Sequence, residues 1–449
     1  MLKKSFAIIS SFIKNNVVEP LQKLSSLKSL KKSTALSIIA FAAVSFSSCK
    51  KEANPGSDSF DNRSTAAADY PTSVTSLPVV SVPAGDITAN TTWDNDHIWE
   101  INGIVTVTGG TLTIEAGTYI KSTVNPGGAN PPANGVLVVS KTGKIHAVGD
   151  AANPIVFTSR YLLDGLANTT PNPGDFGGVI ILGNDTVNVA NKLIEGLPDL
   201  AKFHYGGTTG NDNRGEFQFV RIEYAGFALA PDIEVNGLTL GGIGTGTTIH
   251  HVQTAYGKDD GFEFFGGSVS PSYLVALGSD DDQFDFDNGF NGTITFGLSL
   301  ADGTSSHSGT SPNSDSNGIE SDNNSVAESA SFNLIPRTNP RLDKFSVIGT
   351  QTAAGATGLG YLNGARVRRG SSIRMNNAVV TGFKTGVTFD SGTAAGDAAN
   401  SNISNTSIHG FNFGLVGSPA GTGRILPAVS ATAASFGMLN PWYANRPGL

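Results

Sequence analysis

Short apolar runs divided by glycine-centred polar turns make up most of the chain after about residue 100. Each run is rich in β-branched residues, which favours strands over helices. The first runs are residues 104–107, 112–114, 136–139, 144–148 and 154–158. None of the connections leaves room for a crossover helix, so the pattern predicts an all-β fold and excludes a doubly wound α/β fold.

A repeat of 22 residues identifies the kind of all-β fold, because residues 251–267 align without a gap to residues 273–289. A shorter copy at residues 315–320 places Ile319 with the phenylalanines and Glu320 with Glu263. Further upstream, residues 221–226 resemble residues 252–257. The repeat pairs Asp259 with Asp281, Asp260 with Asp282, Phe262 with Phe284, and Glu263 with Asp285.

Three short strands in about 22 residues form one coil of a right-handed parallel β-helix, in which stacked coils bury one continuous core. A β-sandwich needs no such fixed period. We expect Phe262, Phe284 and Ile319 to stack inward while Glu263 points outward, because side chains alternate along a strand. Loop insertions are expected at residues 161–176, 186–215 and 303–316.

The first 85 residues differ from this body. Seven lysines precede an apolar run at residues 35–46, which suits a signal peptide and is too short to span a bilayer. Cys49 is the only cysteine and follows Ser47-Ser48, which resembles the lipidation site of bacterial lipoproteins. The expected organisation is a signal peptide (1–48), a lipidated flexible tether (49–85), and a β-helix with terminal caps (86–449). Trp93 and Trp99 are expected in the first cap and Pro441-Trp442-Tyr443 in the last.

The net charge of the chain limits the classes of ligand that it can bind. Removing residues 1–49 leaves 22 basic and 36 acidic residues, a net charge of about −14. Nucleic acid is therefore excluded as a partner, because phosphate binding needs a basic surface. An acidic chain suits a surface protein or one that binds divalent cations.

The aspartates and glutamates of the repeat are the main candidate chemistry. Stacked carboxylates about 5 Å apart repel each other unless a cation, a shared proton or N–H donors intervene. Three interpretations remain open: a Ca²⁺ site, a catalytic acid/base set formed by Asp260, Asp281 and Asp282, or a structural ladder that caps turns. The candidate metal ligands are Asp259, Asp260, Glu263, Asp281, Asp282 and Asp285.

Two other groups are weaker candidates. His204 and Tyr205, in the middle insertion, could share a groove with Arg221, Glu223 and Tyr224, where aromatic rings beside carboxylates suit sugar binding. Neighbouring strand residues point to opposite faces, so His250 and His251 are not expected to bind one metal ion together.

Residues 259–267 (DDGFEFFGG) and the strand at residues 177–183 (GGVIILG) resemble segments of secreted Bacteroidetes lipoproteins of the pectate-lyase-like β-helix superfamily. The resemblance covers roughly residues 100–350 and implies the fold more than a function. Polygalacturonase-type glycosidases also place aspartates on neighbouring coils, but their Gly-His-Gly motif is missing, and His307 lies in a loop. Lys258 is a candidate lyase base by position only.

The expected function is that of an outer-membrane or cell-surface lipoprotein. It is anchored through Cys49, and its β-helix binds an extended ligand, a glycan, together with Ca²⁺. The alternatives are a polysaccharide lyase or glycoside hydrolase that uses the acidic residues, and a structural or adhesive surface protein. The sequence leaves open whether the chain is an enzyme and which membrane face it occupies.

Overall fold

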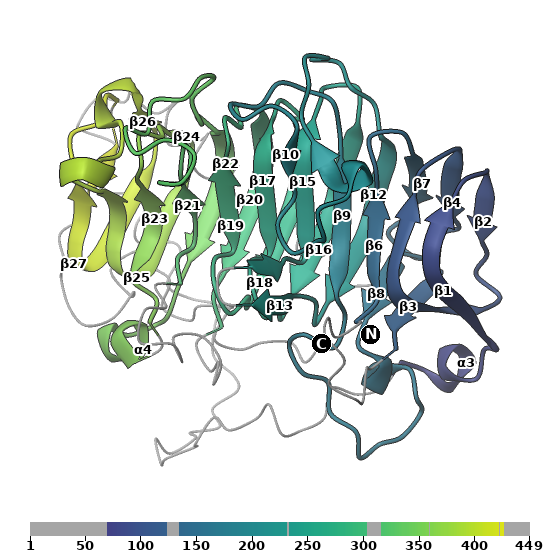
Figure 1. Cartoon of the computed structure of the whole chain (residues 1–449). Coiled ribbons are helices and arrows are strands. Elements are labelled where there is room, and N and C mark those ends of the chain that lie inside the picture. Colours follow the sequence, from purple (N-terminus) through teal and green to yellow (C-terminus); the bar gives the residue numbers. More distant parts are fainter. Residues whose placement is uncertain are drawn as a thin grey trace, which may run out of the picture. The chain divides into compact units, whose positions relative to one another are not determined.

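The computed structural model describes residues 70–123, 134–230, 233–302, 316–358, 360–421 and 423–425. Cys49, the predicted signal peptide, the expected cap at residues 441–443 and most of the insertion at residues 303–316 lie outside these residues. In the described part, parallel strands lie side by side from the purple and blue β1–β4 to the yellow β27 (Figure 1).

The strands form three parallel sheets, which the chain visits in turn. Sheet 1 contains β6 (Val136–Val139), β9 (Gly178–Leu182), β15 (Leu238–Ile243), β17 (Phe262–Gly267), β19 (Phe284–Asp287), β21 (Glu320–Ser321) and β23 (Asn363–Val367). Sheet 2 contains β2 (Thr91–Trp93), β4 (Thr111–Ile114), β7 (Lys144–Val148), β24 (Arg374–Asn376) and β26 (Asn402–Ser404). Sheet 3 contains β5 (Tyr119–Ser122), β8 (Ile155–Thr158) and β28 (Arg424–Ile425).

Longer strands bend and belong to two sheets each. They are β1 (Val79–Ile87), β3 (Ile98–Val107), β12 (Gly215–Glu223), β16 (Thr248–Ala255), β18 (Ser272–Leu277), β20 (Thr293–Leu300), β22 (Arg341–Ile348), β25 (Val379–Phe389) and β27 (Ser407–Val416). The predicted all-β, right-handed parallel β-helix with loop insertions is confirmed.

The register bears out the 22-residue repeat, because β17 pairs with β19 so that Phe262 faces Phe284 and Glu263 faces Asp285. Glu320 continues this row on β21, as the shorter copy predicted. The alignment further upstream was wrong by one residue, since Arg221 pairs with Gln253 rather than with Val252. A slip of one position exchanges the inward and outward faces of a strand, so only the paired register assigns them.

One apolar core runs through the stacked coils. Phe262 and Phe284 are fully buried and stack with ring centroids 5.0 Å apart, and Ile319 is buried beside them as predicted. At the first coils Trp93 and Trp99 stack at 5.4 Å. Because each coil covers the next, the core is one continuous cluster from Trp93 to Ile408.

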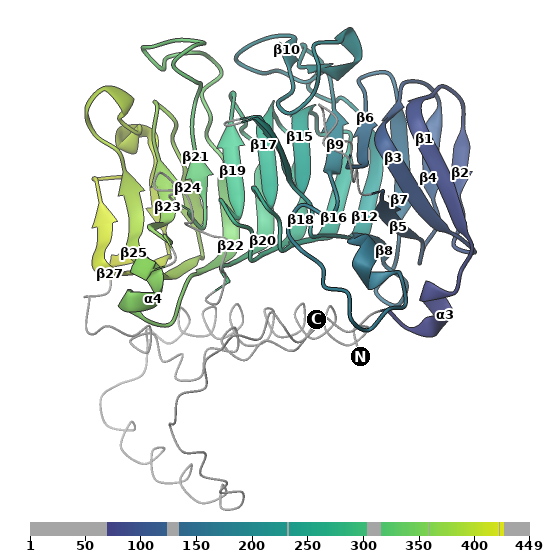
Figure 2. The same cartoon turned by 60° about the horizontal axis from the view of Figure 1, so that its bottom comes forward.

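The middle insertion folds over the outer face of sheet 1. Its short antiparallel pair, β10 (Lys192–Leu193) and β11 (His204–Tyr205), lies near β15 and β17 (Figure 2). Phe203 and Leu197 of the insertion are buried against Ile180 and Phe265, which point outward from the sheet. The outer face of sheet 1 is therefore covered by protein over these coils, and its polar residues are buried with it.

Few other elements accompany the sheets. A second antiparallel pair is β13 (Phe227–Ala230) with β14 (Ile233–Val235), and the helices are α3 (Thr72–Thr75) and α4 (Ala353–Gly358). Short 3₁₀ turns span Arg160–Leu162, Ala201–Phe203, Gly392–Ala394 and Ala398–Asn400. β1 begins before residue 86, so the β-helix starts earlier in the chain than predicted. No helix in the described ranges has both the length and the apolar character needed to cross a membrane.

Candidate acidic site on the outer face of sheet 1

A ladder of Asn and Asp side chains crosses the turns that lead into sheet 1. Asn236 Oδ1 accepts a hydrogen bond from the Asp260 N–H at 3.2 Å, and Asp260 Oδ1 accepts from the Asp282 N–H at 2.8 Å. Asp282 Oδ1 in turn accepts from the Asn317 N–H at 2.5 Å. Each side chain thus holds the backbone of the next coil, as the structural interpretation of these aspartates expects.

A second row of carboxyl groups lies on the strands themselves. Glu263, Asp285 and Glu320 occupy paired positions on β17, β19 and β21 and point away from the apolar core. Asn236 donates its amide to Glu263, and Asn317 donates its amide to Glu320 at 3.2 Å. The amides of the ladder therefore join the two rows into one network.

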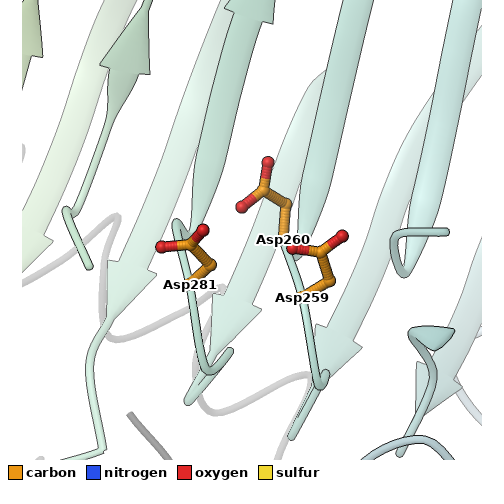
Figure 3. A group of neighbouring side chains, drawn as sticks. All are labelled: Asp259, Asp260 and Asp281. Atoms are coloured by element: carbon orange, nitrogen blue, oxygen red, sulfur yellow. The ribbon is translucent and has the colours of Figure 1, made fainter. Parts of the chain in front are cut away.

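The two rows bring together two groups of carboxylates. One oxygen each from Asp259, Asp260 and Asp281 lie within 4.8 Å of one another (Figure 3). Asp260, Glu263 and Asp285 meet the same limit, so Asp260 belongs to both groups. We call these five residues the acidic cluster; no other set of three such ligands close enough for a metal ion occurs in the part of the chain that the structure describes.

Burial raises the pKa values of three carboxyl groups of the cluster, those of Asp260, Glu263 and Asp285. For Asp260 the burial effect comes first, and the charges of Asp259 and Asp282 add to it. Asp287 lies two residues after Asp285 on β19. Burial raises its pKa to about 6, and the charge of Asp322 adds to this effect. The groups whose pKa lies well above its ordinary value are Asp260, Glu263, Asp282, Asp285 and Glu320.

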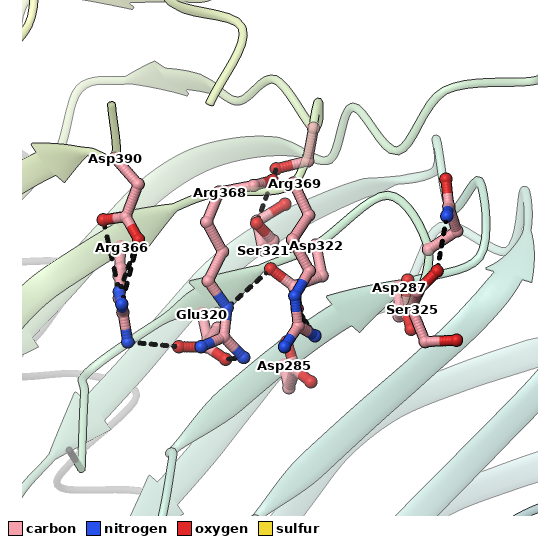
Figure 4. Close-up of polar contacts among 12 residues, drawn as sticks. Asp285, Asp287, Glu320, Ser321, Asp322, Ser325, Arg366, Arg368, Arg369 and Asp390 are labelled. Carbon is pink, nitrogen blue, oxygen red and sulfur yellow. Dashed lines mark hydrogen bonds and ion pairs between the residues drawn. The ribbon is translucent and has the colours of Figure 1, made fainter. Parts of the chain in front are cut away.

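Arginines balance the acids on the next coils, at β21 and β23. Arg368 pairs with Glu320 and donates its Nε to Asp322 at 2.7 Å, while Arg369 reaches the other oxygen of Asp322 at 2.6 Å (Figure 4). Asp322 is buried, so this paired arrangement supplies the charge that its carboxylate needs. Arg366 forms a further ion pair with Asp390 at 2.9 Å.

His204 and Tyr205 lie beside this region but serve the fold of the insertion. Tyr205 is fully buried and donates its hydroxyl to Asn288 Oδ1 at 2.9 Å. His204 bonds to Asp199 at 2.8 Å and to the Asn191 carbonyl at 2.8 Å. These contacts hold the insertion on the sheet, and they leave Tyr205 no ring face for a sugar.

Arg221, Glu223 and Tyr224 do not meet His204 and Tyr205 in one groove. They lie on and after the part of β12 that belongs to sheet 3, where Arg221 and Glu223 form a buried ion pair. The Glu223 carboxylate also accepts from Tyr70 at 3.0 Å and Thr158 at 2.8 Å. This pair fastens the segment before β1 to the outside of sheet 3.

Most of the chain matches a known protein family. A model of the pectate-lyase-like β-helix domain matches residues 85–419. The chain belongs to this family. A comparison with curated proteins finds no match.

Two solved structures of tailspike protein 2, from an Escherichia coli O157:H7 bacteriophage, are among the structures that this chain is similar to. The enzymatically active domain, from bacteriophage CBA120, is 13% identical with a TM-score of 0.38, over 74% of this chain and 42% of that chain. The full-length tailspike protein is 14% identical with a TM-score of 0.36, over 74% of this chain and 37% of that chain. This chain spans about two fifths of the length of the tailspike chains that it matches.

Sequence reasoning missed the asparagines of the ladder, although a signal for them exists. An Asn-Gly or Asp-Gly pair precedes the strand at residues 236–237, 260–261, 317–318 and 363–364. The glycine is needed because the coils approach closely; a Cβ on Gly237 would lie 2.6 Å from the Gly261 carbonyl oxygen. The dipeptide therefore marks several of the turns into sheet 1, and its first side chain joins the ladder at Asn236, Asp260 and Asn317, whereas the turn into β19 has Asp282-Gln283 instead.

The acidic cluster can bind a cation or share protons. Its oxygens are closer together than the roughly 6.5–9.5 Å between the carboxyl groups of inverting glycosidases. Oxygens at this separation are the ligands that Ca²⁺ prefers, and Ca²⁺ would remove their mutual repulsion. Without a cation, burial and the neighbouring charges raise the pKa values of Asp260 and Glu263, which favours their protonated forms.

Proposed function

We propose that this chain is a lipid-anchored protein of the bacterial outer membrane whose β-helix binds an extended glycan beside the acidic cluster, with Ca²⁺ between protein and ligand. The observation that carries the proposal is the convergence of five carboxyl groups on two adjacent coils. Ca²⁺ takes about six to eight oxygen ligands at about 2.4 Å. The cluster supplies some of them, and glycan hydroxyl or carboxylate oxygens would complete the set.

Charge balance supports a cation at this place. Glu320 and Asp322 have arginine partners, whereas the hydrogen-bond partners of Asp260 and Glu263 within the described residues are neutral N–H groups. Asp281 is exposed and Asp259 partly exposed, so an ion can approach from solvent. A divalent cation would supply the positive charge that arginines supply one coil away.

The membrane part of the proposal rests on the sequence. Cys49 is the only cysteine of the chain and follows an apolar run and two small residues. A diacylglycerol on its thiol would hold the chain at the membrane, and residues 50–69 would separate the lipid from the first described residue, Tyr70. The weak charged segment after the cysteine, Lys50-Lys51-Glu52, supports export of a Bacteroidetes type.

A polysaccharide lyase or glycoside hydrolase is the second candidate. It is favoured by the raised pKa values of Asp260 and Asp282, because burial and neighbouring carboxylates favour the protonated form that a general acid needs. Asp260 and Asp282 are the residues to which this activity would be assigned. The oxygens of the cluster lie closer together than the inverting mechanism needs and near the roughly 5–5.5 Å of retaining glycosidases. Binding is the leading proposal because it needs only the convergence of the carboxylates, and the test below distinguishes it from turnover.

The test uses the chain from residue 50 with Asp260→Asn, Asp260→Ala and, as control, Asp96→Asn on an exposed residue of the first coils. Asparagine keeps the ladder oxygen and removes the charge. We expect Ca²⁺ to raise the melting temperature of the wild type and the control, and not that of Asp260→Asn. Without Ca²⁺, Asp260→Ala should lose about 1–3 kcal/mol because the Asp282 N–H loses its acceptor.

Binding and turnover are then followed on a panel of acidic and neutral polysaccharides. Ca²⁺-dependent retention of one of them, lost in Asp260→Asn, is the expected result. A melting temperature that ignores Ca²⁺ would remove the cation from the proposal. Release of reducing ends or unsaturated uronates that stops in Asp260→Asn would replace the binding function by the enzymatic one.

A further inference from the structure

Aromatic rings stack along the corner between sheets 2 and 3. The bends of β12, β16, β18 and β20 are made by residues with positive φ, which are Phe219 (52°), His251 (54°), Tyr273 (57°) and Phe296 (62°). The His251 ring lies between Phe219 and Tyr273, with both centroid distances at 4.4 Å and nearly parallel planes. Two neighbouring rings therefore fix the plane of the His251 imidazole.

The positive φ of His251 also cancels the alternation that separates neighbouring residues of a strand. His250 lies on the outer face of sheet 2, paired with Gln218 and Ser272. The bend turns His251 to the same side, and the two Nδ1 atoms lie 2.9 Å apart. The expectation that these histidines could not meet was wrong, because it assumed an extended backbone at residue 251.

We propose that His250 and His251 form a binding site for a divalent first-row transition-metal ion that prefers nitrogen ligands at right angles, such as Cu²⁺ or Ni²⁺. Metal–imidazole bonds of about 2.0–2.1 Å at a right angle place two nitrogens about 2.9 Å apart. The observed Nδ1–Nδ1 distance has this value before any metal is present. The ion would replace the single shared hydrogen between the rings.

Surrounding groups suit such an ion. Glu216 lies on the preceding coil, close enough for its charge to act on His250, and it contacts Gln218 at 3.0 Å and His146 at 3.9 Å. Both histidines are half-buried, so solvent can carry the ion to them. Remaining ligand positions would be filled by water, and the charge of Glu216 nearby would favour the cation.

Both imidazoles are in the form that binds metals. Burial lowers the pKa of His250, and burial together with the neighbouring His250 lowers the pKa of His251 to about 4. The negative charge of Glu216 opposes the effect on His250 without reversing it. At neutral pH both rings are therefore neutral and keep a lone pair for a cation.

The test measures Cu²⁺ and Ni²⁺ binding by calorimetry, with excess Ca²⁺ present to occupy carboxylate sites. His251→Phe keeps the ring stack, since phenylalanine holds the same bend at Phe219 and Phe296. His250→Ser introduces the residue that Ser272 supplies on the next coil. His97→Ala, a partly exposed histidine paired with Asp94, is the control.

We expect one ion per wild-type chain and a loss of affinity of about tenfold or more in His251→Phe and His250→Ser, with none in His97→Ala. The Cu²⁺ electron paramagnetic resonance spectrum should show coupling to two nitrogens in the wild type and to one in either variant. Equal affinities in the wild type and His251→Phe, or no binding by the wild type, would overturn the proposal. Neither result depends on Ca²⁺ or glycan binding.

Discussion

Asp260 shows how one side chain can satisfy a structural and a functional explanation together. Its Oδ1 accepts from the next coil, and asparagine does the same at Asn236. The hydrogen bond therefore does not require a carboxylate. A charge at residue 260, buried beside Asp259 and Glu263, costs free energy that an amide would not. This excess of charge over structural need is what points to a ligand.

Asp287 gives the pH dependence of that cost. Its folded pKa is about 6, above its unfolded value, because burial and the charges of Asp322 and Glu328 outweigh Lys192. The folded state then holds its proton more tightly, so this stabilisation is complete below pH 4 and is lost as pH rises through 6. In EDTA we expect the melting temperature to fall between pH 4 and pH 7, measured by scanning calorimetry.

Asp287→Asn is the matched variant for this prediction. In the wild type the Asn288 N–H donates a hydrogen bond to Asp287 at 2.6 Å. An asparagine at residue 287 keeps an oxygen that can accept this bond, but it cannot titrate. The melting temperature of the variant should change less between pH 4 and pH 6 than that of the wild type. A wild-type melting temperature that rises across this range would show that carboxyl groups with lowered pKa values dominate instead.

At the scale of elements, the insertion over sheet 1 depends on apolar anchors. Phe203 is 1% exposed and lies in the cluster formed with Ile180 and Phe265. Phe203→Ala should cost about 3–5 kcal/mol if the insertion unfolds with the body. If the insertion detaches alone, the body keeps its melting temperature and proteases cut between residues 184 and 206. Both outcomes are measured by urea unfolding and limited proteolysis.

Leu200 provides the control, because it lies in the same insertion and is 48% exposed. Leu200→Ala should change stability by no more than about 0.5 kcal/mol and leave the protease pattern as in the wild type. Cleavage of both variants would mean that the insertion also opens when Phe203 is present. The apolar contacts of Phe203 would then not be what holds the insertion on the sheet.

The same elements show what the sequence could and could not predict. The 22-residue period gave the coils and the row of Glu263, Asp285 and Glu320, because stacking at fixed register follows from a repeat. The cover over that row was not predictable, since Tyr205 meets Asn288 across 83 residues of chain. Likewise, nothing local distinguished His251 from an ordinary strand residue, because its positive φ belongs to a corner that only the stacked coils define.

For the whole molecule, the stacked core sets how the chain can present a site. One cluster extends from Trp93 to Ile408, so the strands of sheet 1 keep a fixed spacing over many coils. The acidic cluster and the arginines lie on successive coils at sheet 1. The His250–His251 pair lies on the outer face of sheet 2. Of the acidic cluster, Asp281 is exposed and Asp259 partly exposed, and they lie on two adjacent coils, so the glycan proposed above would run along the stack.

A lipid on Cys49 would hold the protein, and any polymer bound to it, at the membrane. The last prediction tests this anchor. If the thiol carries the lipid, the full-length chain expressed in a Gram-negative host that processes lipoproteins should appear in the outer-membrane fraction. Mass spectrometry should find its N-terminal peptide beginning at residue 49 with a diacylglycerol attached. Cys49→Ser should leave the chain outside the membrane fraction, while the β-helix, which starts more than 20 residues later, keeps its melting temperature. Ser57→Thr, which changes neither the thiol nor the residues before it, serves as the control and should still be lipidated. A Cys49→Ser chain that stays in the membrane fraction would mean that another part of the molecule binds the membrane, and the lipid anchor would be removed from the proposed function.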